Sequence, residues 1–362
     1  MRAHDVAYVP ALTGLRGIAA WWVVVYHFSD PIIDVIPAWL LAIVRHGYIS
    51  VDLFFILSGY VIYLTSGQSF RVLSRGVVYR FLLNRLIRIY PLHFVIMLAY
   101  LVNPLALWLF SSSGVGDGRY DWEYFVASMF LVQNWGGFDE LQWNMPAWSI
   151  SAEFAAYIFC PILAAATISW LSNNFWKLVL LIVCLVTSFG YVFFSSGATS
   201  IGEKITSLGL FRCVVEFWVG LCLGVMGGHG FKGIRNNKAL GSVSIVCLIM
   251  IPLFLVGYGI SDYWLVPIAF TLLIYILSKG DAIFSVLLSS KWIHYLGLIS
   301  YSTYLVHFLI KDWVKFLNNS IGVYQFLLYI LLCFLASVAL YNYVEEPARR
   351  MLRQRLVLEK KS

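Results

Sequence analysis

Two polar residues inside one apolar stretch are the first candidates for chemistry in this chain. The stretch 12–28 carries Arg16 near its start and His27 near its end. At that spacing an α-helix makes about three turns plus 20°, so both side chains lie on one face, roughly 16 Å apart along the axis. A guanidinium can clamp a phosphate, and an imidazole can act as a general base. The alternatives are an arginine that snorkels to the membrane surface and a histidine that only packs.

Two acidic residues in other apolar stretches can support such a base. Asp52 lies in GYISVDLFFILSGY, and Glu153 lies in WSISAEF. Ionisable groups within a bilayer are costly, so each is a candidate for a functional site. Either carboxylate can orient His27 or stabilise its charged form. Asp52 equally fits a structural pair with an arginine.

Two pairs of charged residues are spaced so that both members of each pair lie on one face of a helix. Arg85 and Arg88 are three residues apart in RFLLNRLIRIYPLHF, which places them on one face at the boundary of an apolar stretch. They suit either a phosphate site or the positive charge that cytoplasmic loops carry. Arg212 and Glu216 are four residues apart, and their simplest interpretation is an internal ion pair.

Four further residues are candidates for substrate contacts: Trp148, Ser151, Tyr304 and His307. Trp148 can stack on a sugar ring or belong to the aromatic belt of a membrane protein. Tyr304 and His307 share a helical face with Lys311, and both a structural and a functional role fit that face.

The composition predicts an all-α, multi-pass membrane protein. The chain of 362 residues is 61% hydrophobic and 12% charged, against about 25% charged in soluble domains. The net charge of +7 reflects membrane topology, so we expect no nucleic-acid partner. About ten stretches reach the length of a membrane span. They are 11–29, 48–66, 82–110, 147–170, 176–195, 207–227, 240–258, 263–278, 295–315 and 323–344.

Positive charge orients this prediction. With the N-terminus in the cytoplasm, most of the 25 Lys and Arg fall in cytoplasmic segments, and both termini are cytoplasmic. The short apolar stretch 124–132 would reverse this order if it crossed the membrane. We therefore interpret it as an interfacial or re-entrant segment of the outer loop 111–146. Residues 1–346 form the membrane domain, Pro347 ends the last helix, and 347–362 form a basic cytoplasmic tail.

Together these stretches resemble the acyltransferase-3 family of integral-membrane O-acyltransferases. The resemblance runs along nearly the whole chain. Six pieces carry it: Arg16 with His27, GYISVDLFFILSGY, Arg85-Leu-Ile-Arg88, WSISAEF, SYSTYLVH, and the closing Glu345-Glu346-Pro347.

The resemblance implies transfer of an acyl group, usually acetyl, from cytoplasmic acetyl-CoA to a hydroxyl on the far side of a bacterial inner membrane. The acceptor would be a glycan or glycolipid such as O-antigen lipopolysaccharide or exopolysaccharide. His27, Asp52 and Glu153 would be catalytic, and Arg16 with the pair Arg85 and Arg88 would bind CoA. We expect the standalone form of the family, without a fused SGNH domain, and no bound metal. We also expect the protein to contact membrane lipid, and a homo-oligomer is compatible with the sequence.

Three alternatives stay open on the sequence alone. His27 can act as a general base or can carry the acyl group itself. A transporter or flippase of a polar lipid also suits buried charges in many spans, although no paired inverted halves are visible. The other large family of membrane O-acyltransferases would place its key histidine late in the chain, where His307 is the candidate.

Overall fold

The computed structural model describes residues 9–110, 118–171, 174–227, 238–257, 261–279, 283–317 and 322–351. Within these ranges every regular element is helical and no strand occurs, which confirms the predicted all-α class. The main helices are α1 (Pro10–His27), α2 (Ala38–Arg45), α3 (Ser50–Ser66), α4 (Arg75–Tyr100), α5 (Val102–Phe110), α6 (Trp122–Met129), α7 (Trp148–Leu171), α8 (Phe175–Ser195), α9 (Ile205–Gly227), α10 (Lys238–Gly257), α11 (Asp262–Ser278), α12 (Ile283–Leu288), α13 (Lys291–Leu298), α14 (Ser300–Leu317) and α15 (Val323–Leu340).

The chain forms two compact units, each assembled from separate segments. Unit 1 comprises Met1–Ala19, Tyr48–Phe81 and Ala155–Leu298. Unit 2 comprises Ala20–Gly47, Leu82–Phe154 and Ile299–Ser362. Helix α1 contributes to both, so that Arg16 belongs to unit 1 and His27 to unit 2.

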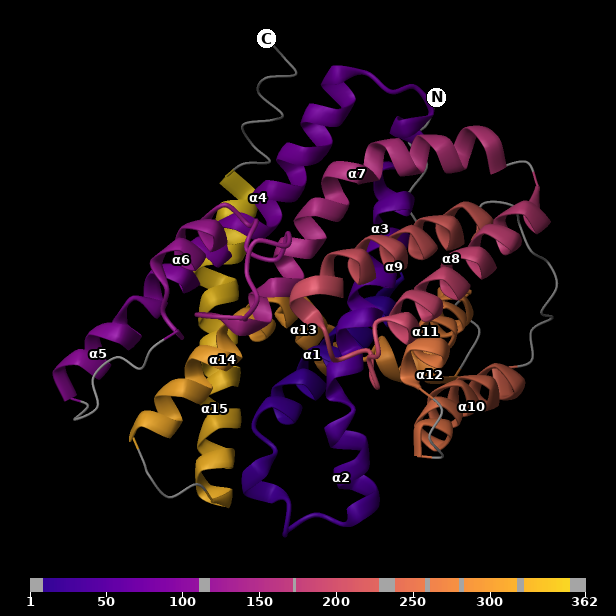
Figure 1. Cartoon of the computed structure of the whole chain (residues 1–362). Helices are drawn as coiled ribbons and strands as arrows, with labels where there is room; N and C mark the ends of the chain where they lie inside the picture. Colours follow the sequence, from indigo (N-terminus) through magenta and orange to yellow (C-terminus); the bar gives the residue numbers. More distant parts are fainter. Residues whose placement is uncertain are drawn as a thin grey trace. The chain divides into compact units, whose positions relative to one another are not determined.

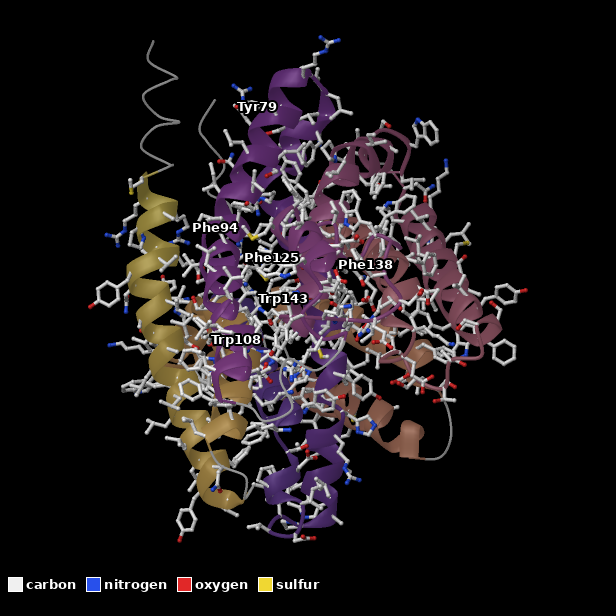
Figure 2. All side chains as sticks on the ribbon, turned by 60° about the vertical axis from the view of Figure 1, so that its left-hand side comes forward. Tyr79, Phe94, Trp108, Phe125, Phe138 and Trp143 are labelled. Carbon is white, nitrogen blue, oxygen red and sulfur yellow. The ribbon has the colours of Figure 1, made fainter. Side chains whose placement is uncertain are left out.

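Many of the helices are suited to a membrane. Six helical stretches of the described residues are long and apolar enough to cross one, and α13 with α14, bent by 65°, can supply a seventh. Large apolar side chains such as Phe94 and Trp108 are exposed on α4 and α5 (Figure 2), as expected of helices that face lipid. Each of the ten predicted stretches coincides with a helix, but α1, α10 and α11 fall outside the six. The count of ten and the orientation therefore stay predictions.

Unit 1 is built on the close packing of α3 against α9 (Figure 1). A side-chain carbon added at Gly59 would lie 1.9 Å from the carbonyl oxygen of Phe217, and one added at Gly220 would lie 1.9 Å from that of Ile56. Only glycine permits the two backbones to approach this closely, as small residues do between membrane helices.

Unit 2 holds the end of α1 against the pair formed by α14 and α15, which run side by side (Figure 1). The hydroxyl of Tyr329 donates to the carbonyl of Val24 at 3.0 Å, and its ring packs edge-on against Phe28 with centroids 4.9 Å apart. Cys333 and Val314 complete this buried cluster. The last turn of α1, which carries His27, is thereby anchored.

The segment predicted to be interfacial or re-entrant contains the short helix α6. Its eight residues extend about 12 Å, which is too short to cross a bilayer. The chain turns sharply afterwards at Leu131, which has a positive φ of 60°. Trp143 is fully buried beside Phe125, with centroids 4.7 Å apart (Figure 2), and donates from Nε1 to the carbonyl of Asp121 at 2.7 Å. The loop after α6 is therefore a packed part of unit 2.

The prediction that Pro347 ends the last helix is wrong. After α15 the backbone forms a π-helical turn over Tyr341–Glu345, and helix continues to Met351. The N–H of Glu346 donates to the carbonyl of Tyr341, five residues back. A wide π turn rearranges the hydrogen bonds just before the proline, which offers no N–H of its own. Residues 352–362 of the predicted tail lie outside the described residues.

Candidate active site

A pair of histidines forms the centre of unit 2. His27 is the last residue of α1, and His307 lies in the middle of α14, where it is fully buried. Nε2 of His307 is 3.2 Å from Nδ1 of His27, and the ring centroids are 5.1 Å apart. The two imidazoles are therefore within hydrogen-bonding distance.

The neighbouring carbonyls identify which nitrogens carry hydrogen. Nδ1 of His27 lies 3.0 Å from the carbonyl oxygen of Val23, and Nδ1 of His307 lies 2.6 Å from that of Tyr304. Because a carbonyl oxygen only accepts, we assign the hydrogen of each neutral ring to Nδ1. The single Nδ1 hydrogen of His27 is then shared between the carbonyl oxygen of Val23 and Nε2 of His307. Nε2 of His27 keeps its lone pair and has no hydrogen bond to any described residue.

A positive charge lies close to the histidine pair. The ring of Phe308 packs edge-on against His27, with centroids 5.5 Å apart, and Nζ of Lys311 lies 3.3 Å from the centre of the Phe308 ring. Lys311 forms no salt bridge with any residue in the described ranges. The next residue, Asp312, pairs instead with Arg119 at 2.5 Å. The ammonium is thus held by an aromatic face, and its charge is not neutralised by a carboxylate in contact.

Two of the predicted substrate residues have structural partners. The hydroxyl of Tyr304 lies 2.8 Å from Ser149 Oγ and 3.0 Å from the carbonyl of Pro146, which joins α14 to the start of α7. Ser151 Oγ donates to the carbonyl of Leu131 at 2.9 Å and accepts from the N–H of Asn134 at 3.2 Å. Tyr304 also presents its backbone carbonyl to His307, so it positions the histidine.

The remaining predicted residues of unit 2 lie on α4 and α7. Trp148 is buried in the first turn of α7, and Glu153 is partly exposed one turn later. Arg85 and Arg88 are both partly exposed on α4 at the predicted spacing of one turn. Arg85 and Arg88 therefore present two positive charges on one helical face.

Asp52 has an arginine partner within unit 1. Arg212 donates to both carboxylate oxygens of Asp52, from Nε at 2.7 Å and from Nη2 at 2.6 Å. Nη1 of Arg212 donates to the carbonyl of Ile201 at 2.8 Å. Of the two roles open for Asp52, this geometry is that of the structural pair. The expected ion pair of Arg212 with Glu216 is wrong, because the bidentate geometry of a guanidinium is met by Asp52 on a different helix.

Arg16 lies on a part of α1 that packs closely on α12 and α13 within unit 1. Glycines flank the arginine. A side-chain carbon at Gly14 would lie 2.0 Å from the carbonyl oxygen of Leu288, and one at Gly17 would lie 2.6 Å from the backbone nitrogen of Gly297. The half-buried Arg16 is thus carried by a helix whose position is set by backbone contacts.

Two residue pairs, one in each unit, were not revealed by the sequence. Nothing in the spacing of His27 and His307, 280 residues apart, indicates that they meet. The available signal was weaker: His307 and Lys311 share a helical face, and both lie in an apolar stretch where charge is costly. For Asp52 and Arg212, each residue was singled out, but only the fold shows that they pair.

The fold and the site define a multi-pass helical membrane protein with a pair of histidines, of which His307 is fully buried. The chain belongs to the acyltransferase-3 family, because the family's model, described as an acyltransferase domain, matches residues 9–342. This confirms the resemblance inferred from the motifs.

Two named relatives extend over nearly all of the chain. Acyltransferase MdmB of Streptomyces mycarofaciens is 27% identical over 390 residues, which cover 97% of this chain and 94% of MdmB. O-acetyltransferase OatA of Staphylococcus aureus (strain NCTC 8325 / PS 47) is 25% identical over 380 residues and 96% of this chain. The chain spans 58% of the length of OatA and of the other Staphylococcus aureus relatives. No solved structure matches the chain significantly.

Proposed function

We propose that this protein is an O-acyltransferase that moves an acyl group, in the first place acetyl, from acyl-CoA to a hydroxyl of a glycan or glycolipid. The observation that carries the proposal is the pairing of His27 with His307, which leaves the lone pair of His27 Nε2 without a partner among the described residues. Membership of the acyltransferase family and the O-acetyltransferase name of one relative support the reaction class.

In the first route, His27 is a general base. Nε2 takes the proton of the acceptor hydroxyl while the hydroxyl oxygen attacks the carbonyl carbon of the thioester. The C–S bond then breaks, and the proton passes to the departing CoA thiolate. When His27 is protonated, its Nδ1–H group is already directed at the lone pair of His307 Nε2. His307 thus takes the orienting role that we had expected of Asp52 or Glu153.

In the second route, His27 carries the acyl group. Nε2 attacks the thioester carbon and displaces the CoA thiolate, which gives an acyl-imidazolium. The acceptor oxygen then attacks the acyl carbon, the N–C bond breaks with its electron pair returning to Nε2, and the proton of the acceptor hydroxyl passes to the CoA thiolate. Both routes develop negative charge on the carbonyl oxygen. The ammonium of Lys311 lies on the ring of Phe308, and that ring packs against His27. We therefore assign Lys311 the stabilisation of that negative charge.

The two routes differ in whether the protein itself becomes acetylated when no acceptor is present. Radiolabelled acetyl-CoA is mixed with the purified protein, and the protein is denatured within one turnover. Label on the wild-type chain that is absent from His27→Gln supports the carrier route. Labelled acceptor in full reactions, with no labelled protein at any time, supports the base route.

For the donor, we propose that Arg85 and Arg88 bind phosphates of CoA, and the contact of Arg16 with CoA stays a prediction. CoA is a polyanion, and a guanidinium is suited to phosphate. This assignment requires the basic end of α4 to face the cytoplasm of a bacterial inner membrane, with the acceptor on the other side. Cysteine labelling of the loop at 196–204 and of the segment before α4 from either side of the membrane tests that orientation.

The proposal as a whole is tested by transfer itself. Purified protein in lipid nanodiscs is incubated with acetyl-CoA and isolated surface polysaccharide, and the polysaccharide is examined by NMR. We expect O-acetyl signals that require both the protein and His27. Saturable CoA binding would also distinguish an acyltransferase from a flippase, for which no acyl donor is needed.

A further inference from the structure

Unit 1 contains a carboxyl group that lacks a hydrogen-bond donor. Glu216 lies on α9 and is 1% exposed. No N–H group, and no O–H group of another side chain, donates to either of its carboxylate oxygens among the described residues. Burial of an ionised carboxylate without a partner is strongly unfavourable, so the group is expected to take up a proton.

The charged groups around Glu216 do not compensate it. Asp52 from α3 acts on Glu216 through its charge and through a side-chain hydrogen bond that favours the protonated acid, and Arg212 from α9 acts on it through its charge. These two are already paired through two hydrogen bonds, so their charges cancel. The third acid of the cluster, Asp262 at the start of α11, accepts from Tyr48 at 2.7 Å and from the N–H of Ile201 at 2.7 Å. Asp52 and Asp262 therefore have donors for their carboxylates, whereas Glu216 has none.

We propose that Glu216 is a proton-binding site within the helical bundle of unit 1 and that Asp52 and Glu216 are alternative partners of Arg212. In the arrangement described, the proton resides on Glu216 and Arg212 pairs with Asp52. If the proton passes to Asp52, the O–H bond on Glu216 breaks and one forms on Asp52. Glu216 is then the carboxylate that Arg212 neutralises, four residues away on the same helix. The site binds one proton in either arrangement, and the total charge is unchanged.

The close packing of α3 and α9 explains why solvent does not compensate Glu216. Its neighbour Phe217 contacts Gly59 through the backbone, and Gly220, one turn later, contacts Ile56 in the same way. Glu216 therefore lies where two helices meet without space for intervening side chains. A proton is the smallest ligand that neutralises a carboxylate there.

Infrared spectroscopy of the full-length protein in nanodiscs tests the first half of the proposal. At neutral pH we expect a carbonyl band of a protonated carboxylic acid that shifts in D₂O and is missing from E216Q. Labelling of glutamate carboxyls with ¹³C should shift the same band in the wild-type protein. This second measurement assigns the band to a glutamate even if E216Q folds poorly. Absence of the band in the wild-type protein would overturn the proposal.

The second half is tested by D52N. Once Asp52 has lost its charge, Arg212 requires Glu216 as its carboxylate, so the acid band should disappear from D52N. A band that persists there would refute the exchange of partners. Melting temperatures give an independent measurement: D52N/E216Q should lose more than the sum of the single variants, whereas additive losses argue against exchange. Glu203→Gln is the matched control, because Glu203 is an exposed carboxylate held by Thr199, and its loss should leave the acid band unchanged.

Discussion

Nε2 of His307 lies 3.2 Å from Nδ1 of His27. In each ring Nδ1 lies within hydrogen-bonding distance of a backbone carbonyl, which belongs to Val23 for His27 and to Tyr304 for His307. Two neutral imidazoles in this arrangement form a directed chain, with hydrogen on Nδ1 in both rings. The chain ends at the lone pair of His27 Nε2. It differs from a histidine oriented by a carboxylate, since the orienting group here carries no charge.

The first prediction concerns the two histidines. His27→Ala should abolish acyl transfer, because it removes the only nitrogen of the pair whose lone pair has no partner in the described structure. His307→Ala should lower kcat by about 10²–10⁴-fold, the usual contribution of a group that supports a general base, with little change in KM. Rates of acetyl transfer by purified variants check both. An unchanged kcat in His307→Ala would remove its orienting role.

The second prediction concerns charge stabilisation by Lys311. Lys311→Met keeps the packing on Phe308 but removes the ammonium, so kcat should fall by about 10²–10³-fold, as when one group that stabilises an oxyanion is lost. Lys315→Met is the matched control: this lysine lies on the same helix, 5.7 Å from the ring centre of Phe28, and has no assigned role in transfer. Equal losses in the two variants would argue for a general effect of charge on α14.

The third prediction concerns the donor site. Arg85→Ala and Arg88→Ala should each weaken CoA binding by about tenfold or more, which corresponds to loss of a charge-assisted hydrogen bond. Calorimetric titration of purified protein with CoA gives the affinities. Arg75→Ala, an exposed change at the start of the same helix, serves as the control. Unaltered affinity in both variants would exclude the pair as a phosphate site.

The fourth prediction concerns stability within unit 1. Arg212→Met leaves Asp52 as a buried carboxylate without its bidentate partner and should cost about 3–5 kcal/mol of folding free energy. Replacement of both residues by apolar ones of similar size, Asp52→Leu with Arg212→Met, should cost much less. Thermal unfolding in detergent compares the three proteins. A double variant less stable than Arg212→Met would contradict this account.

The fifth prediction concerns the contact between α3 and α9. Gly59→Ala places a methyl group 1.9 Å from the carbonyl oxygen of Phe217 and should destabilise the protein by about 1–3 kcal/mol, because the helices must separate. Gly227→Ala is the matched control at the end of α9, where nothing lies within 4 Å of the new carbon. We expect it to be neutral. Melting temperatures of the two variants provide the comparison.

Local rules account for most of the helices. Apolar stretches predicted helices at all ten positions. The stretch at 124–132, interpreted as interfacial or re-entrant because a span there would reverse the charge orientation, overlaps a helix of eight residues. The failure at Pro347 shows the limit of such rules. A proline normally ends a helix, but here the π turn over Tyr341–Glu345 changes which carbonyls need a partner, and this depends on geometry that the residue type does not encode.

The helical class and the family follow from the amino-acid sequence alone. So does the set of residues whose types are costly in a membrane, among them Arg16, His27, Asp52 and His307. The sequence determines them because helical periodicity and burial costs act over a few residues. Which of these residues contact each other is known from the three-dimensional fold: His27 pairs with His307, and Arg212 pairs with Asp52 and not with Glu216. A helical period reveals the face on which a residue lies, whereas the partner on that face depends on how helices distant in sequence pack.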